Sequence, residues 1–375
     1  MANQTTINAS CLCRTSSFSF SVDTSSLPLK AHLCHCAICR RITGSLCAFH
    51  AAVPVPSTLK GLTPYASSAN VMRHFCTSCG CHMLDYAKSD EQWHIATGVA
   101  EASEDVFEFE EHLFVESTKD GGFSDWIPNI NGKPLRRWDG QPEVSRELSV
   151  DWQGRRDCSP QPPKDAKRLR AQCHCNGVTF FITQPDSTSL TAQSREVSLE
   201  DSVTETYFTA IHKQKYLASN CACCSCRLSS GGDIVPWAFI PISHVTLANG
   251  EPFPSLVARE ASRAYEGRDS NTLKSYRSSA GITRSFCGRC GATVFYHTDK
   301  RPHIIDVAVG LLDAGSGARA AEWFEWVSER VSFEEDAVNK ALVESLKDGM
   351  REWGHRKQYR TGPMKEFLDA RKERA

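Results

Sequence analysis

The sequence lacks both a large net charge and a long apolar segment, and each absence excludes a class of function. Its 375 residues contain 43 Lys and Arg against 44 Asp and Glu, so the chain as a whole offers no basic field that would attract nucleic acid or an anionic membrane surface. No stretch approaches the roughly 18 uninterrupted apolar residues of a membrane span, and residues 1–6 lack the basic and apolar regions of a signal peptide. We therefore expect a cytoplasmic protein with no membrane partner.

Cysteine is the residue type that the sequence has in excess, with 18 in the chain. Without a secretion signal, closely spaced cysteines favour metal binding over disulfides, and the members of a Cys-x-Cys pair are poorly placed to bridge each other. Fourteen cysteines form two series of seven, and each series has the clusters Cys-x-Cys, Cys-x-Cys-x-x-Cys and Cys-x-x-Cys-Gly in that order. This repetition predicts a duplicated domain. Cys158 lies outside both series and is predicted to be a spare thiol.

The duplication sets the expected domain boundaries. The second copy contains two polar insertions of about 25 residues, around 184–206 and 249–279, which we expect to be surface loops. The segment between the copies has ten Lys and Arg against six Asp and Glu, and it includes a proline-rich stretch that cannot form a regular helix. The predicted parts are a first domain at 1–130, a linker at 131–170, a second domain at 171–331 and a C-terminal segment at 332–375.

Short β-branched and aromatic segments bounded by Gly, Pro or Asp are typical of both copies, for example 178–182, 293–296 and 304–309. They predict two compact, mostly β domains. In the C-terminal segment, Ser332 and Glu335 fit a helix capping box. The apolar residues that follow recur at helical spacing and predict an amphipathic helix before a basic tail: Val338, Leu342, Leu346, Met350 and Trp353.

The first and third clusters of each copy can form a closed metal site. Zinc in structural sites is tetrahedral and binds four thiolates, commonly offered by two short hooks that meet in space. Such a site would tie the start of a domain to its middle and contribute folding free energy directly. The two sets, called the outer groups here, are Cys11, Cys13, Cys76 and Cys79 in the first copy and Cys173, Cys175, Cys287 and Cys290 in the second.

The middle clusters, called the inner groups here, supply only three thiolates each: Cys34, Cys36 and Cys39, and Cys221, Cys223 and Cys226. Three protein ligands and an open position are typical of a catalytic zinc. Because three thiolates give the zinc site a net negative charge, it is a weak electrophile but is suited to exchange of a fourth, external thiolate. Thiol chemistry is therefore favoured over hydrolysis. The alternatives are reduced thiols without metal, or a closed site completed by Cys47, Cys81, His82 or His35 in the first copy and by Cys224 or His297 in the second.

The motifs CHCAICRR at 34–41 and FCTSCG at 75–80 resemble the glutathione-dependent formaldehyde-activating enzyme and centromere protein V family. In the second copy, CACCSCR at 221–227 and FCGRCG at 286–291 are similar to the same family. The resemblance implies an Mss4-like β fold with one structural zinc and one three-cysteine zinc per domain, up to four zinc ions per chain. It also implies carbon–sulfur lyase activity on an adduct of glutathione and formaldehyde, with glutathione as co-substrate and small thiols and aldehydes as the partners.

Arginines directly follow the third ligand of each inner group. Arg40, Arg41 and Arg227 could hold the carboxylate of a peptide thiol in a bidentate pair. The second copy has a different sequence after Arg227, and its insertions could cover or reshape the pocket, so the first copy is the preferred active one. The two copies could also pack as an internal pseudo-dimer, which leaves the oligomeric state open.

Two further functions remain open. One is a non-catalytic chromatin or scaffold protein, which would place the chain in the nucleus. Residues 1–130 have 8 Lys and Arg against 13 Asp and Glu, which would repel DNA, whereas the linker and residues 351–375 each carry an excess of four basic residues. The other is a lyase for a different, larger thiol or carbonyl substrate.

Overall fold

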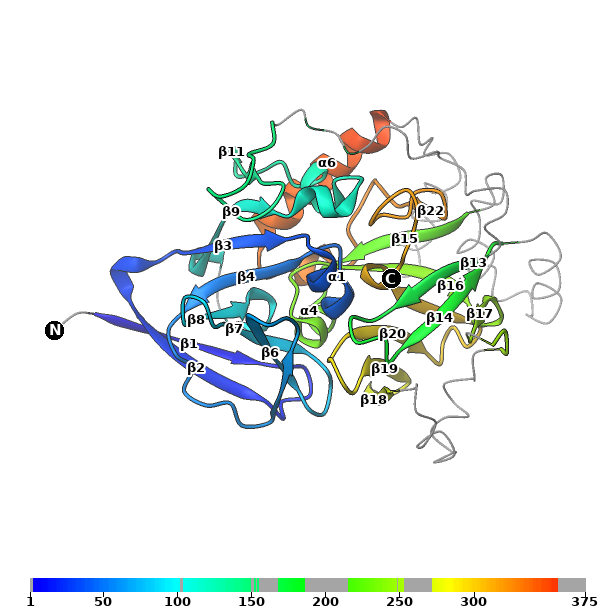
Figure 1. Cartoon of the computed structure of the whole chain (residues 1–375), viewed down its shortest axis with the longest axis horizontal. Helices are drawn as coiled ribbons and strands as arrows, with labels where there is room; N and C mark the ends of the chain where they lie inside the picture. The colour runs from blue at the N-terminus through cyan, green and yellow to red at the C-terminus, as the bar shows by residue number, and fades with distance from the viewer. Residues whose placement is uncertain are drawn as a thin grey trace.

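The computed structural model describes residues 3–101, 104–149, 152, 154, 168–185, 215–247, 249–252 and 272–356. Within them, most elements are strands, and the two largest sheets have eight and seven strands (Figure 1). The prediction of a mostly β protein is confirmed. No helix in these residues is long and apolar enough to cross a membrane.

The first copy is built on the eight-stranded sheet, in the order β12-β9-β3-β4-β8-β7-β6-β5. All neighbours are antiparallel except β9, which runs parallel to β3 and to β12. A separate hairpin of β1 and β2 carries Cys11 and Cys13 in its turn. The strands are β1 (Gln4–Ser10), β2 (Ser17–Asp23), β3 (Leu29–Cys34), β4 (Ala48–Val53), β5 (Leu62–Ala66), β6 (Val71–Cys76), β7 (His82–Ala87), β8 (Gln92–Ala96), β9 (Phe107–Leu113) and β12 (Arg136–Arg137).

The second copy repeats this arrangement in its seven-stranded sheet, in the order β18-β19-β20-β21-β16-β15-β22. The order matches β5-β6-β7-β8-β4-β3-β9 position by position, and β22 is again parallel to the strand beside it. A small sheet carries Cys173 and Cys175 between β13 and β14. The strands are β13 (Arg168–Gln172), β14 (Thr179–Thr183), β15 (Tyr216–Cys221), β16 (Val235–Pro241), β17 (Val245–Thr246), β18 (Leu273–Ser279), β19 (Ile282–Cys287), β20 (Thr293–Thr298), β21 (Ile304–Ala308) and β22 (Phe324–Trp326).

The two copies pack against each other through matching elements at the centre of the molecule (Figure 1). The short helix α1 (Ala37–Thr43) of the first copy contacts the turn Val309–Leu311 of the second, and α4 (Cys224–Ser230) of the second contacts the turn Thr97–Val99 of the first. Gly310 N donates to Gly44 O at 2.8 Å, and Gly98 N donates to Gly231 O at 3.1 Å. A Cβ on Gly98 or Gly310 would overlap the opposite backbone, so glycine permits this approach. The copies therefore form an internal pseudo-dimer.

The first part of the predicted linker packs on the first copy. Leu135, Trp138 and Leu148 are buried, and β12 adds to the edge of the first sheet beyond the short hairpin β10 (Asn129–Ile130) and β11 (Lys133–Pro134). The prediction weighted charge and proline and overlooked these apolar residues, whose burial stabilises the segment as part of the sheet. The proline-rich stretch at 159–163, Cys158 and most of both insertions lie outside the described residues.

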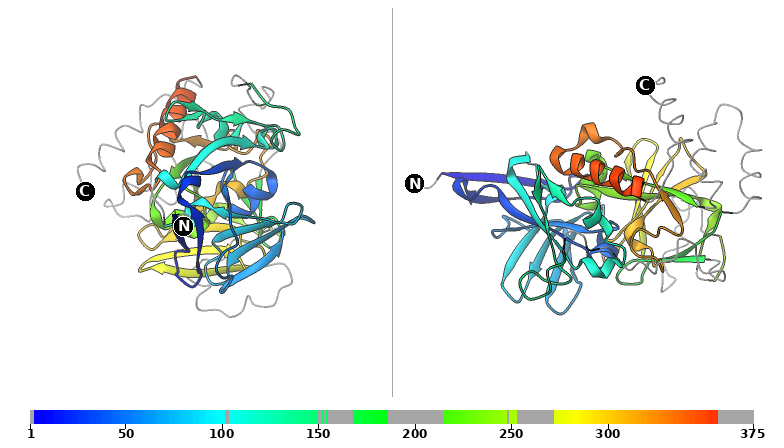
Figure 2. Two further views of the ribbon diagram at one scale, coloured as in Figure 1. Left: turned by 90° about the vertical axis from the view of Figure 1, so that its left-hand side faces the viewer. Right: turned by 90° about the horizontal axis from the view of Figure 1, so that it is seen from above.

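The predicted C-terminal helix is present as α6 (Lys340–Arg356), with Leu342, Leu346, Met350 and Trp353 buried. It begins later than the capping box predicted. Asn339 Oδ1 accepts the Leu342 N–H at 2.9 Å and caps the helix, while Ser332 N donates to Asn220 O at 2.8 Å beside β15. The Ser332 hydroxyl lies 3.3 Å from Ser219 Oγ in β15, so both its backbone and its side chain contact that strand and Ser332 does not cap the helix. The helix packs on the first copy (Figure 2), and the ring centres of Trp353 and Trp126 lie 5.3 Å apart.

Candidate metal centres

Each outer group converges on one point, although its two hooks lie far apart in the sequence. The Sγ atom of Cys13 lies 3.5 Å from that of Cys11 and 3.6 Å from that of Cys76. In the second copy, Cys175 Sγ lies 3.6 Å from Cys173 and 3.5 Å from Cys287. Four thiolates around a tetrahedral metal at about 2.3 Å would place their sulfurs about 3.8 Å apart. The geometry therefore fits a closed four-thiolate metal site in each copy.

The inner groups form at the junction of a strand and a short helix. In the first copy, Cys34 ends β3, and Cys36 is the N-cap of α1, where its Sγ accepts the Cys39 N–H at 3.3 Å. The second copy repeats this, because Cys221 ends β15 and Cys223 Sγ accepts the Cys226 N–H at 3.3 Å. The cap geometry points all three sulfurs of a group toward one another. Each group has its ligand atoms within 4.8 Å of one another and fits a metal ion.

The side chains considered as a fourth ligand do not join either inner group within the described residues. His35 Nε2 lies 2.9 Å from His112 Nδ1, and His82 Nε2 lies 2.9 Å from Cys290 O. Cys224 Sγ donates to Asp336 O at 3.3 Å, and His297 Nε2 lies 3.3 Å from Pro302 O. Cys47 and Cys81 are buried in the main hydrophobic core instead. An inner group thus offers a metal three ligands and leaves a position for a ligand from outside.

A buried arginine contacts the third cysteine of each inner group, and the sequence analysis missed both. Arg73 on β6 donates from Nη2 to Cys39 Sγ at 3.1 Å and from Nη1 to Asp85 Oδ2 at 2.7 Å. Arg284 on β19 places Nη1 and Nη2 each 3.7 Å from Cys226 Sγ. Each arginine stands three residues before the first cysteine of the third cluster. An alignment of the two copies would have revealed this shared position.

These contacts hold negative charge on the sulfurs. Hydrogen bonds with Cys34 and Cys39, aided by the charge of Arg73, outweigh burial and lower the pKa of Cys36 to about 3. The thiols of Cys221 and Cys223, followed by Arg284, hold the pKa of Cys226 well below its usual value. Burial alone would lower the pKa of Arg73, but Asp85 and the nearby cysteines raise it. Each inner group therefore contains a thiolate at neutral pH beside a charged guanidinium.

The surroundings of the two inner groups differ in their chemistry. In the first copy, His32 on the Cys34 face of β3 lies 5.9 Å from His50 and 6.0 Å from His94 between ring centres. His50 Nε2 lies 3.3 Å from Asp85 Oδ2. Burial is the first cause that lowers the pKa of His32 and of His50, each to about 3, so both imidazoles are neutral at pH 7. The first inner group therefore lies beside three neutral imidazole rings, those of His32, His50 and His94.

The same three positions in the second copy hold different side chains. By strand register, Ser219 takes the place of His32, Trp237 that of His50 and Asp306 that of His94. The Arg284 guanidinium lies 4.9 Å from the Tyr296 ring centre, and Asp306 pairs with Arg301 at 3.0 Å. The three histidine positions thus hold a hydroxyl, an indole that only donates and a carboxylate.

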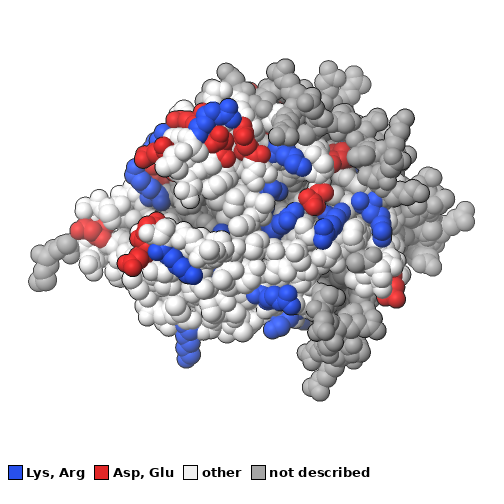
Figure 3. Space-filling model, viewed as in Figure 1, with Lys and Arg blue, Asp and Glu red and all other residues white. Residues whose placement is uncertain are grey.

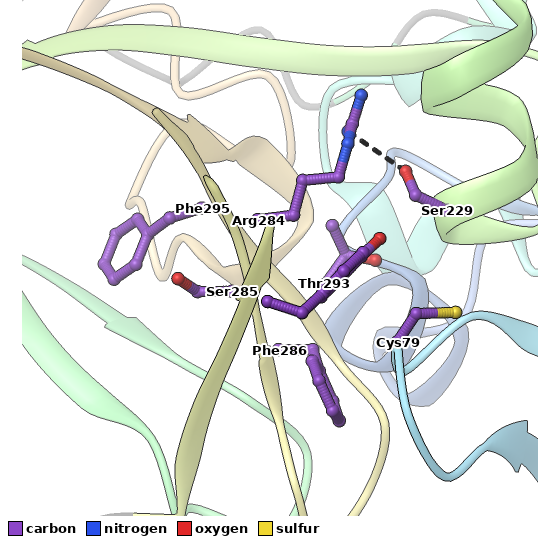
Figure 4. A pocket seen from close by; sticks show the side chains of 8 residues that line it. Cys79, Ser229, Arg284, Ser285, Phe286, Thr293 and Phe295 are labelled. Atoms are coloured by element: carbon purple, nitrogen blue, oxygen red, sulfur yellow. Dashed lines mark hydrogen bonds between the residues drawn. The ribbon is translucent and has the colours of Figure 1, made fainter. Parts of the chain in front are cut away.

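A small pocket lies beside the second inner group, where the two copies meet (Figure 4). Arg284 and Ser229 point toward each other across its upper end, with Arg284 Nη1 donating to Ser229 Oγ at 3.0 Å. Cys79 enters the same pocket from the outer group of the first copy. The outer group of one copy therefore forms part of the surroundings of the other copy's inner group.

The arginines singled out from the sequence occupy three different environments. Arg40 donates from Nε to His35 O and from Nη2 to Ser117 O, each at 3.1 Å. Arg227 is buried and donates from Nη1 to Gly98 O and Ala100 O, so it holds the copies together. Arg41 keeps 29% of its side chain exposed and pairs with Asp313 Oδ1 of the second copy at 3.4 Å. Figure 3 shows Lys and Arg side chains gathered beside a hollow on one face of the molecule.

Comparison with protein-family models gives a match. The family model described as "Glutathione-dependent formaldehyde-activating enzyme" matches residues 6–117 and 206–328, more than half of the chain. The first segment contains all seven cysteines of the first series, and the second contains the inner group and the third cluster of the second series. No curated protein matches the chain significantly.

Proposed function

We propose, on the premise that the chain belongs to the glutathione-dependent formaldehyde-activating enzyme family, that it is a zinc-dependent carbon–sulfur lyase. Its substrate would be the adduct of a small thiol with an aldehyde, such as glutathione with formaldehyde. One observation carries the proposal: each copy has a group of three cysteines with no fourth protein ligand among the described residues and a buried arginine on its third sulfur.

Zinc is the metal that best suits these donors, because it accepts four thiolates in the outer groups and three thiolates with an open position in the inner groups. When bound in an inner group, it would supply a coordination position that a substrate thiolate can occupy. Cys34, Cys36 and Cys39 would hold it in the first copy. Arg73 would offset part of the negative charge of the three sulfurs through its contact with Cys39.

In the forward direction the thiol gives up its proton, its sulfur forms a bond to the carbonyl carbon, and the carbonyl π electrons move to the oxygen. The oxygen then takes up a proton, so the adduct contains all the atoms of the thiol and the aldehyde. The reverse direction breaks the carbon–sulfur bond and releases thiol and aldehyde. In the first copy, the neutral, half-buried imidazole of His32 would donate a hydrogen bond to the oxygen, with the buried His50 beside it.

The first test combines metal content with turnover on the full chain purified under reducing conditions. We expect about four zinc ions per chain, one for each group of cysteines. We also expect faster exchange between formaldehyde and its glutathione adduct, measured by exchange NMR with ¹³C-labelled formaldehyde, than in buffer alone. About two tightly held ions and no acceleration would overturn the proposal.

Matched variants assign the activity to one copy. C36S and C223S remove the same ligand from the two inner groups, and each should lower the zinc content by one ion. We expect C36S to abolish the exchange and C223S to retain most of it. Acceleration with larger thiols or aldehydes, and none with glutathione and formaldehyde, would replace the proposed substrate with a different one.

A further inference from the structure

Each copy holds a phenylalanine in the left-handed backbone conformation beside its inner group. Phe114 has φ 56° and ψ 39°, and Phe333 has φ 56° and ψ 42°. The residue before each, Leu113 or Ser332, pairs in parallel with the first inner cysteine and accepts a backbone hydrogen bond from the next residue, at 2.8 and 2.9 Å. The two phenylalanines therefore occupy the same position. A bulky side chain disfavours this conformation, which persists only where surrounding contacts fix it.

The turn that follows each phenylalanine is bound to the helix of the same inner group. In the first copy, Arg40 of α1 donates from Nη2 to Ser117 O at 3.1 Å. In the second copy, Cys224 of α4 donates from Sγ to Asp336 O at 3.3 Å. Each phenylalanine thus lies between two contacts with the segment that carries the inner cysteines. These contacts hold its strained backbone in place beside them.

The side chain of Phe114 packs against the first inner group. It contacts the small hydrophobic cluster that Cys34 and Cys39 form with Ala48, and Cys36 packs on the same cluster. Cys34, Cys39 and Ala48 are buried, whereas Cys36 and Phe114 are half-buried. Solvent therefore reaches this cluster at Cys36 and Phe114, so the phenyl ring borders the path of a ligand from outside.

The corresponding ring of the second copy is largely exposed, because Phe333 keeps 53% of its surface accessible. In the first copy, the segment after β12 covers the turn, since Gly140 O accepts the Phe114 N–H at 3.0 Å and Trp138 O accepts the Val115 N–H at 2.9 Å. The described part of the second copy has no strand in the place of β12, and β22 is the edge of its sheet. The two copies therefore hold the same aromatic residue in a covered and in an exposed setting.

We propose that Phe114 restricts the first inner group to thiols whose sulfur is attached to an unbranched carbon. This inference rests on the proposed function, because it concerns the thiol that would occupy the open position of the same site. The ring leaves room for a CH₂ group beside the sulfur, whereas methyl groups on that carbon would overlap it, and close-packed side chains resist such overpacking. The second inner group, where Phe333 is exposed, accepts branched thiols as well.

The experiment measures the binding of two small thiols to the zinc-loaded full chain by isothermal titration calorimetry. The probes are 2-mercaptoethanol and 2-mercapto-2-methylpropan-1-ol, which differ by two methyl groups on the carbon that bears the sulfur. C223S leaves the first inner group to be measured, and C36S leaves the second. The methyl groups also change the basicity of the thiol, and this contribution is the same at both groups. We expect the preference for 2-mercaptoethanol to be about tenfold larger in C223S than in C36S.

Substitution of the ring locates the preference. Adding F114A to C223S should reduce this excess to about twofold or less, because the branched thiol gains affinity. Adding F114L, which keeps a smaller apolar side chain on the cluster, should give an intermediate excess. Zinc content and circular dichroism check that both variants keep their metal and fold. The matched control adds F333A to C36S, where the ratio of the two affinities should stay the same because Phe333 is exposed.

The outcomes separate this inference from the proposed function. If both thiols bind with the same ratio at the two inner groups, or if F114A and F114L leave the ratio of C223S unchanged, the role of Phe114 is overturned and the thiol site stands. If neither thiol binds to either inner group, the proposed function is overturned together with this inference.

Discussion

The two copies share the positions of seven cysteines and the order of seven strands, yet the side chains around their inner groups differ. His50 of the first copy corresponds to Trp237, and His32 to Ser219. The arginine on the third sulfur is present in both. The comparison separates the residues that could hold a metal, which are the cysteines and the arginine on the third sulfur, from neighbouring side chains that differ between the copies. We expect the second set to determine what reacts at each inner group.

The copies also differ in the residues that each places against the other. The second copy contributes His174, which bonds to Tyr65 of the first copy, and Trp326, which contacts Trp126 together with Trp353 of α6. The first copy contributes the apolar Leu12 and the ligand Cys79 to the surroundings of the second inner group. Since Cys79, Trp126, Trp326 and Trp353 are buried at these contacts, we expect the described parts of the two copies to unfold together.

The largest expected effect is the loss of an outer ligand. C76S or C287S removes one of four thiolates from a closed site, and structural zinc contributes about 10 kcal/mol or more to folding. We expect either variant to abolish the cooperative unfolding transition, measured by circular dichroism in urea. C36S and C223S are the matched controls and should shift that transition little. Similar losses in all four variants would show that outer and inner groups do not differ in role.

The next largest expected effect is a difference between the two copies in how acid pH lowers their stability. His50, His82 and His112 are buried in the first copy, and burial is the first cause that lowers their pKa values, to about 3, 4 and 3. The unfolded chain takes up protons below pH 6.5, whereas the folded chain stays neutral at these rings. Their contribution to stability is therefore complete above pH 6.5 and is lost as the pH falls toward 3 to 4. At pH 5 the cost is about 2 kcal/mol per histidine.

The second copy has Trp237, Thr293 and Val331 at the corresponding positions, and none of these titrates. The buried carboxylates act in the opposite sense, but each copy has one such carboxylate near its inner group, Asp85 and Asp306, with a pKa raised by burial. We expect the hydrogen-exchange protection factors, which correct for the intrinsic exchange rate, to fall more between pH 7 and pH 5 in β4, β7 and β9 than in β16, β20 and β22, through local opening below the shared unfolding transition. An equal fall in the two sheets would contradict the assignment.

Replacement of the arginine on the third sulfur should lower the free energy of unfolding more in the first copy, at Arg73, than in the second, at Arg284. R73M leaves Asp85 buried without its guanidinium, and breaking a buried pair costs about 3–5 kcal/mol. R284M loses contacts to Ser229, Cys226 and the Tyr296 ring but strands no carboxylate that it pairs with, so about 1–2 kcal/mol is expected. Urea unfolding at matched zinc content measures both. Equal losses would show that Asp85 is held by other groups.

The spacing of the cysteines was enough to group them as the structure brings them together, because each hook or cap is a local feature of a few residues. The mostly β class followed from short β-branched segments. Arg73 and Arg284 could not be found from local pattern, because their contacts depend on the register of β6 and β19 beside a cluster over thirty residues away. The only sequence signal was that both copies carry an arginine at the same place.

Roles assigned from neighbouring residues in the sequence also differ from the contacts in the structure at two places, Arg227 and Ser332. Arg227 follows the third inner cysteine directly, but α4 directs its side chain to the carbonyls of Gly98 and Ala100 in the other copy. Ser332 fits a capping box, yet its backbone is paired with Asn220 before the helix begins. Both cases show a local motif overridden by a contact between distant segments, which the sequence of one chain does not encode visibly.

The smallest expected difference between the copies, about 1 kcal/mol between two matched glycine variants, tests the contact between them. Gly80 and Gly291 both have positive φ, 76° and 75°, and a Cβ on either would overlap a phenylalanine ring of the opposite copy, Phe286 or Phe75. A Cβ on Gly291 would also lie 2.7 Å from His82 Nε2, which bonds to Cys290 O across the same contact.

Overpacking and the strained backbone together should cost about 2 kcal/mol in G80A and about 3 kcal/mol in G291A, where a hydrogen bond between the copies is lost as well. Urea unfolding with zinc bound measures the difference. Because each glycine faces the other copy, the double variant should cost less than the sum of the two single ones if the first substitution already loosens the contact. Full additivity would show instead that the two contacts respond independently and that the pseudo-dimer is not a single cooperative unit.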